Sequence, residues 1–171
     1  MKKLGLIYDE SLNISEKTTP EYYGCVRDLF ESEEVQSLAT FPQHDFINRL
    51  RHVVSVSYMS YCLCKVRSLD YRTAARAGLL HDLYYYDWHE NDWSHRPHGY
   101  RHPGFAVKNA AELCGGELDK LTFNIIKRHM WPLTVIPPKY KESYVVCFAD
   151  KYCARKEYQA CKEQKKNKKM K

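Results

Sequence analysis

The sequence predicts an all-α fold of one domain: its periodicity and lack of strand patterns indicate the class, and its size indicates a single domain. Apolar residues recur at intervals of three and four along several segments, which is the period of an amphipathic helix. No alternation of apolar and polar residues continues far enough between turn signals to predict a sheet. The chain has 171 residues, of which 44% are hydrophobic, enough for one core but not for two. We therefore expect one compact bundle of about six or seven helices.

Turn and capping signals predict two short helices in the N-terminal part of the chain. Pro20 marks the start of the first, because proline suits the first position of a helix. Ser32 can cap the second, over residues 33–39, by accepting a hydrogen bond from a free backbone N–H group. Pro42 then interrupts the chain, since it restricts the residue before it to extended conformations.

Two longer helices are predicted to lie in the core. The first spans about residues 45–69, and His52 lies at the end of its apolar stripe. Asp70 can cap the second, which is small or apolar nearly all round and should be buried by close neighbours. His81 and Asp82 lie near its C-terminal end, about 100° apart around the axis, so both side chains can point toward one place beyond it.

A polar, aromatic loop over residues 84–100 follows and shows no helical period. It is longer than most connections in a compact domain, which indicates a lid or a substrate-binding segment. His95, Arg96 and His98 are its candidate catalytic residues.

Three more helices are predicted in the C-terminal half. Pro103 suits the first position of one of them, a second covers residues 117–130 after a glycine pair, and the third begins near residue 140. Each carries a histidine or aspartate that ends or interrupts its apolar face, and these are His102, His129 and Asp150.

The six histidines and aspartates on these helices are candidate metal ligands: His52, His81, Asp82, His102, His129 and Asp150. Neutral imidazole nitrogens bind divalent ions, and carboxylate oxygens offset their charge. A single buried histidine is usually a satisfied core residue, and a single buried aspartate usually belongs to an ion pair. The recurrence of such residues on separate apolar helix faces instead favours a metal centre around His81 and Asp82.

The order of these residues resembles that of the HD-domain metal-dependent phosphohydrolase superfamily over roughly residues 44–157: His52, then His81-Asp82, then Asp150. His102 and His129 between them resemble the branch that holds two metals, and segments 81–88 and 127–134 resemble small bacterial members. The doublet is followed by Leu83-Tyr84-Tyr85, where two-metal cyclic-dinucleotide enzymes usually have a glycine and lysine, and no Gly-Tyr-Pro motif occurs, so a cyclic dinucleotide is not expected. The resemblance implies an HD-type bundle with one ion held by His52, His81, Asp82 and Asp150, and another by Asp82, His102 and His129.

The function implied by the resemblance is hydrolysis of a phosphoester, in a nucleotide or another small phosphorylated metabolite, by a metal-activated water. Asp82 would bridge two divalent ions, which could be Fe, Mn, Ni, Co or Zn. His95 or His98 could protonate the leaving group, and Arg96 could bind a phosphate through two hydrogen bonds. Two alternatives stay open: a di-iron oxygenase of the HD fold, and a non-catalytic sensor that binds a nucleotide.

Net charge and cysteine content indicate which partners, domains and cross-links the chain can have. The net charge is +6, but residues 162–171 hold six lysines and one glutamate, so the rest of the chain is nearly neutral. We therefore expect no specific nucleic-acid binding, one domain over residues 1–160 and a frayed basic tail over 161–171. The seven cysteines include no C-x-x-C pair, which argues against a disulfide framework.

No apolar run is long enough for a signal peptide or for a membrane span of about 20 residues. Together with the cysteine pattern, this predicts a soluble cytoplasmic protein. Lys151 beside Asp150 either contacts substrate or points off the helix, and we favour the second.

Overall fold

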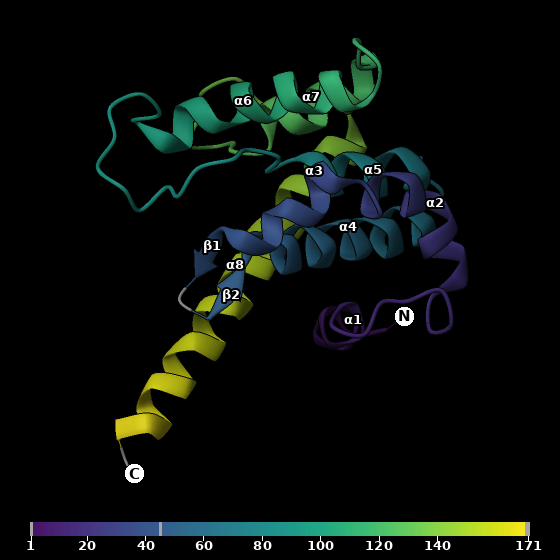
Figure 1. Ribbon diagram of the computed structural model, residues 1–171. Coiled ribbons are helices and arrows are strands. Elements are labelled where there is room, and N and C mark those ends of the chain that lie inside the picture. Colours follow the sequence, from purple (N-terminus) through teal and green to yellow (C-terminus); the bar gives the residue numbers. More distant parts are fainter. Residues whose placement is uncertain (1, 45, 170–171) are drawn as a thin grey trace.

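Figure 1 shows a bundle of helices in a computed structural model that describes residues 2–44 and 46–169. The described residues form eight α-helices: α1 (Leu4–Ser11), α2 (Pro20–Phe30), α3 (Glu33–Gln36), α4 (Arg49–Val66), α5 (Tyr71–Leu80), α6 (His98–Leu113), α7 (Lys120–Arg128) and α8 (Lys141–Lys169). A 3-10 helix, η1 (Ser37–Thr40), and a small antiparallel hairpin of β1 (Pro42–His44) and β2 (Ile47–Asn48) connect α3 to α4. The predicted all-α class is confirmed, and α1 is the helix that had no predicted counterpart.

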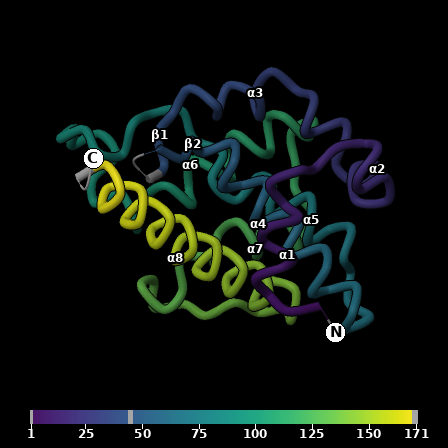
Figure 2. The backbone as a smooth tube through the Cα atoms, turned by 90° about the horizontal axis from the view of Figure 1, so that it is seen from below, coloured from purple at the N-terminus to yellow at the C-terminus, as the bar shows by residue number. Residues whose placement is uncertain are grey.

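The core is built around α4 and α5, which pack along each other. Gly78 on α5 allows their close approach, because a Cβ atom there would lie 3.0 Å from the Cα atom of Ser57 on α4. α2 and α7 pack against α5, while α1 and α8 pack against α4. The predicted burial of α5 by close neighbours is therefore confirmed. Seen from below, α8 crosses the bundle from α7 toward the hairpin (Figure 2).

Side-chain caps fix the starts of the two central helices. The N–H of Thr73 donates to Asp70 Oδ1 at 2.9 Å, which confirms the predicted cap of α5. α4 begins at Arg49, where Asn48 accepts a hydrogen bond from the N–H of Arg51 at 2.9 Å. This start is later than predicted because the hairpin occupies the chain before it. Asp45, near which we expected α4 to begin, lies outside the described residues.

The start of α6 was predicted wrongly. The helix begins at His98, so Pro103 lies inside it, in the second turn, and the irregular loop between α5 and α6 ends at Pro97. A proline inside a helix removes one backbone hydrogen bond, and its ring crowds the carbonyl four residues earlier, here that of Gly99. Gly99 in the first turn packs closely against Leu133, since a Cβ atom there would lie 2.7 Å from the Leu133 Cδ2 atom.

The C-terminal helix continues into the basic segment at the end of the chain. Residues 161–169, expected to form a frayed tail, continue α8 as helical turns that extend away from the bundle (Figure 1). The last two residues, 170 and 171, lie outside the described part of the chain. Among the described residues, no helix combines the length and apolar character needed to cross a membrane.

Candidate metal centre

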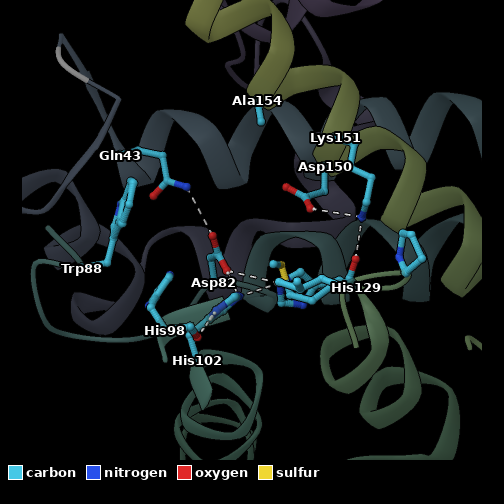
Figure 3. A pocket seen from close by; sticks show the side chains of 12 residues that line it. Gln43, Asp82, Trp88, His98, His102, His129, Asp150, Lys151 and Ala154 are labelled. Carbon is cyan, nitrogen blue, oxygen red and sulfur yellow. Dashed lines mark hydrogen bonds and ion pairs between the residues drawn. The ribbon is translucent and has the colours of Figure 1, made fainter. Parts of the chain in front are cut away.

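The six predicted ligands come together although they derive from five separate segments, and four of them line one cavity: Asp82, His102, His129 and Asp150. His52 lies on α4, His102 on α6 and Asp150 on α8. His81 and His129 are the C-terminal cap residues of α5 and α7, and Asp82 follows His81 directly. The four histidines and Asp82 are buried, and Asp150 is half-buried. In Figure 3 the side chains of Asp82, His102 and His129 point toward one another, with Asp150 on the neighbouring α8.

Backbone carbonyls fix the protonation of three of the histidine rings. A carbonyl can only accept a hydrogen bond, so each Nδ1 atom near one must carry the proton, and Nε2 of the neutral ring keeps its lone pair. The Nδ1-to-carbonyl distances are 2.7 Å for His81 and Gly78, 2.9 Å for His102 and His98, and 2.8 Å for His129 and Ile126.

The Nε2 lone pairs of His102 and His129 face each other and Asp82. The two Nε2 atoms are 2.8 Å apart, and Asp82 Oδ1 lies 3.2 Å from the first and 3.5 Å from the second. Asp82 Oδ1 is buried and has no hydrogen-bond partner among the described residues. Three electron-pair donors this close repel one another unless a proton or a metal cation lies between them.

A second group of donors forms on the other side of Asp82. Asp150 Oδ1 lies 3.2 Å from His52 Nε2 and 3.7 Å from His81 Nε2. His81 Nε2 also lies 3.7 Å from Asp82 Oδ2, and it has no hydrogen-bond partner in the described structure. Ligand atoms of His52, His81 and Asp150 lie within 4.8 Å of one another, as do those of His81, Asp82 and His129. The two groups share His81, and either could hold a metal ion.

The surroundings of Asp82, Asp150 and His129 favour the forms of these groups that bind cations, whereas nearby carboxylates raise the pKa of His81. Burial alone would raise the pKa of Asp82, but the neighbouring histidines, His81 first, hold it well below its ordinary value. Burial opposes ionisation of Asp150 as well, and His52 and His81 lower its pKa. Burial, together with the charges of His102 and His81, lowers the pKa of His129 to about 3, so this ring is neutral at neutral pH.

His52 differs from His129 in its electrostatic surroundings. Its Nδ1 atom lies 2.9 Å from Glu157 Oε2. Burial opposes its protonation, but Glu157 and then Asp150 outweigh that effect and raise the pKa of His52 well above its ordinary value. In the metal-free protein, His52 is therefore the ring most disposed to carry a positive charge, between two carboxylates.

The cavity above the donor groups has a volume of about 460 Å³, which suits a small metabolite. It is lined by Gln43, Asp82, Trp88, His98, His102, His129, Met130, Pro132, Leu133, Asp150, Lys151 and Ala154. Lys151 bends back over the site, with Nζ donating to the His129 carbonyl at 2.9 Å (Figure 3). We had favoured a side chain that points off the helix, and that prediction was wrong. The ammonium group provides a positive charge at the cavity wall.

The structure separates the three candidate catalytic residues of the loop. His98 lines the cavity, and burial followed by the charge of His102 lowers its pKa to about 3. Arg96 lines an adjacent cavity of about 530 Å³, which shares Trp88 and His98 with the first. His95 is buried, and its ring stacks on that of Tyr86 with the two ring centroids 4.0 Å apart. It is not among the residues that line either cavity.

Gln43, Arg49 and Glu157 support the site, and the sequence reasoning assigned them no role. Gln43 Nε2 donates to Asp82 Oδ2 at 3.5 Å, and Arg49 Nε donates to Gln43 Oε1 at 3.3 Å. Arg49 and Glu157 were detectable, because an arginine three residues before His52 and a glutamate seven residues after Asp150 share the apolar helix faces of these ligands. Gln43 lies on a short strand, and no periodicity indicates it.

Comparison with known protein families, with curated proteins and with solved structures finds no match. The interpretation of the site therefore rests on its geometry. The described residues form buried groups of histidine and aspartate that could hold a metal ion, and kinship with the HD-domain superfamily stays a prediction.

Proposed function

We propose that this protein is a metal-dependent phosphohydrolase of the HD-domain type, acting on a phosphoester of a nucleotide or another small phosphorylated metabolite. One observation carries the proposal. Four histidine Nε2 atoms converge on the carboxylates of Asp82 and Asp150 at the end of a cavity, while each Nδ1 atom is engaged by a carbonyl or a carboxylate. Histidines that bind metals are usually held in this way through the other ring nitrogen.

The proposed centre holds two divalent ions, one on each side of His81 and Asp82. The first ion would be held by His52, His81 and Asp150. The second would be held by Asp82, His102 and His129. The two carboxyl oxygens of Asp82 would face the two ions. Such a pair of ions lowers the pKa of water and neutralises charge on phosphoryl oxygens. Imidazole and carboxylate donors suit Mn, Fe, Co, Ni or Zn.

The chain's own residues would position the substrate. Lys151 supplies a positive charge at the cavity wall beside His129, where it can attract a phosphate group. His98 has a pKa of about 3 and holds a single ring proton at neutral pH. We therefore assign it a hydrogen-bonding role in place of proton donation to the leaving group. Trp88 offers an apolar wall, and Arg96 in the adjacent cavity can contact a more distant part of the substrate.

The test is phosphate release from a panel of nucleotides and small phosphoesters, with Mn²⁺ added or with metals chelated. We expect turnover of one substrate class that requires metal and is lost in Asp82→Ala. Lys108→Ala is a matched control, because Lys108 lies on α6 like His102 but has a 73% exposed side chain.

Phosphate release that persists in Asp82→Ala, or no release across the panel by metal-loaded protein, would contradict the proposal. In the second case, bound iron with O₂ consumption would indicate an oxygenase, and nucleotide binding without turnover would indicate a sensor.

A further inference from the structure

Glu157 is a buried carboxylate directly behind the candidate metal centre. It lies on α8, seven residues after Asp150, and its side chain is fully buried. Oε2 lies 2.9 Å from His52 Nδ1, and Oε1 has no hydrogen-bond partner among the described residues. An ionised carboxylate is costly to bury in this way unless nearby positive charge compensates for it.

The contact of Glu157 distinguishes His52 from the other three histidines of the centre. Those rings donate their Nδ1–H groups to backbone carbonyls, which carry no net charge. A carboxylate in that position fixes the ring and also makes its Nε2 atom a stronger electron donor. Once its Nε2 atom has lost its proton, His52 is therefore the ring of this set that donates most strongly to a cation.

The two sides of the centre also differ in nearby negative charge. His52 contacts two carboxylates, Asp150 through Nε2 and Glu157 through Nδ1. His102 and His129 both contact a single carboxylate, that of Asp82. Since opposite charges attract strongly in a buried site, an ion on the His52 side gains more electrostatic stabilisation.

We propose that Glu157 is a positioning residue that makes the His52–Asp150 side of the centre the tighter of two metal sites. This inference rests on the proposed metal centre but not on the proposed reaction. The competing explanation is that Glu157 merely satisfies a buried histidine, in which case its charge has no specific effect on metal binding.

The test is calorimetric titration of metal-free protein with Mn²⁺, comparing wild type with Glu157→Gln. The amide oxygen of glutamine can still accept the Nδ1–H hydrogen bond, but the negative charge is removed. We expect the tighter of two Kd values to rise by about 10–100-fold and the weaker to stay unchanged. Combining Glu157→Gln with His129→Ala should show the same rise in the one binding event that remains.

Ser143→Ala is the matched control, because Ser143 lies on α8, is 1% exposed and has a hydroxyl group with no hydrogen-bond partner in the described part of the chain. It should leave both Kd values unchanged. Circular dichroism of the metal-free proteins shows whether each variant folds. If Glu157→Gln does not fold, Glu157→Asp is titrated in its place. The shorter aspartate withdraws the carboxylate from His52, so it should also weaken the tighter site alone.

A tighter Kd within about twofold of the wild-type value, far below the change expected for a group that orients a ligand, would overturn this role of Glu157. Equal weakening of both binding events would overturn it as well. Wild-type protein that binds no Mn²⁺ would overturn both this role and the metal centre.

Discussion

The helix-borne residues of the cavity and those of the loop between α5 and α6 are held in different ways. The histidines on α4 and α6 and at the ends of α5 and α7 are fixed by helix packing and by their Nδ1 hydrogen bonds. The loop relies on a few side chains, chiefly Arg49, which donates to the carbonyls of Tyr84 at 2.7 Å and Tyr86 at 3.0 Å. The candidate ligands are therefore held more rigidly than the loop, which forms part of the cavity wall through Trp88.

Asp82→Ala should have the largest effect, because this carboxylate contacts the histidines of both donor groups. We expect loss of bound metal and a fall in activity larger than the about 10–100-fold that follows loss of a group merely holding a ligand. Metal analysis and phosphate release measure the two effects. A folded variant that keeps its metal would show that Asp82 is not a ligand.

His102→Ala and His129→Ala should each remove one ion per chain and leave the other. Both side chains contribute an Nε2 atom to the same pair, 2.8 Å apart, on one side of Asp82. His52→Ala should remove the ion on the opposite side. The measurement is the metal content per chain after loading with Mn²⁺ and desalting. If the His102 and His129 variants still hold two ions, the proposed division of ligands is wrong.

Arg49→Met tests the attachment of the loop and should lower stability without emptying the metal centre. Arg49 is fully buried, and its loss leaves the carbonyls of Tyr84 and Tyr86 without their donors. We expect the free energy of unfolding to fall by about 2–4 kcal/mol and hydrogen exchange in the loop to accelerate.

Arg51→Ala is the control, because Arg51 is an exposed arginine on the same helix. Its effect should stay within about 0.5 kcal/mol. Equal stability of the two variants would show that Arg49 does not anchor the loop.

Substitutions of His95 and Arg96 in the loop, and of His98 at the start of α6, should have the smallest effects. His98→Ala should raise KM by about tenfold or less, consistent with loss of one hydrogen bond, and leave metal content unchanged. Arg96→Ala should change KM less, since Arg96 lines the adjacent cavity, and His95→Ala should alter loop packing alone. Steady-state kinetics on the identified substrate measures these effects. A fall in kcat of about 10²–10⁴-fold in His95→Ala or His98→Ala would instead identify a general acid.

The same contrast explains what could be predicted from the sequence. Helical periodicity predicted the all-α class, and the cap at Asp70 was predicted because its partner, Thr73, is local. The convergence of the ligands was predicted because each of them lies at the end of the apolar face of a helix or interrupts that face. Lys151 was misjudged because the direction of its side chain depends on the carbonyl of His129, which comes from another segment.

The errors lie where tertiary contacts override local signals. Pro103 predicted the start of a helix. α6 instead begins at His98, more than one turn earlier, and Gly99 in this first turn packs against Leu133. Gln43 could not be identified because its position near Asp82 depends on the hairpin and on Arg49, not on a repeating pattern. Long-range contacts of this kind leave no period in the sequence.

The most direct test of the account is the metal content of the folded wild-type protein. The protein would be loaded with Mn²⁺, desalted and analysed by inductively coupled plasma mass spectrometry, beside Asp82→Ala treated in the same way. We expect two ions per chain in the wild type and none in the variant. Wild-type protein that retains no metal, or a variant that retains as much as the wild type, would contradict it.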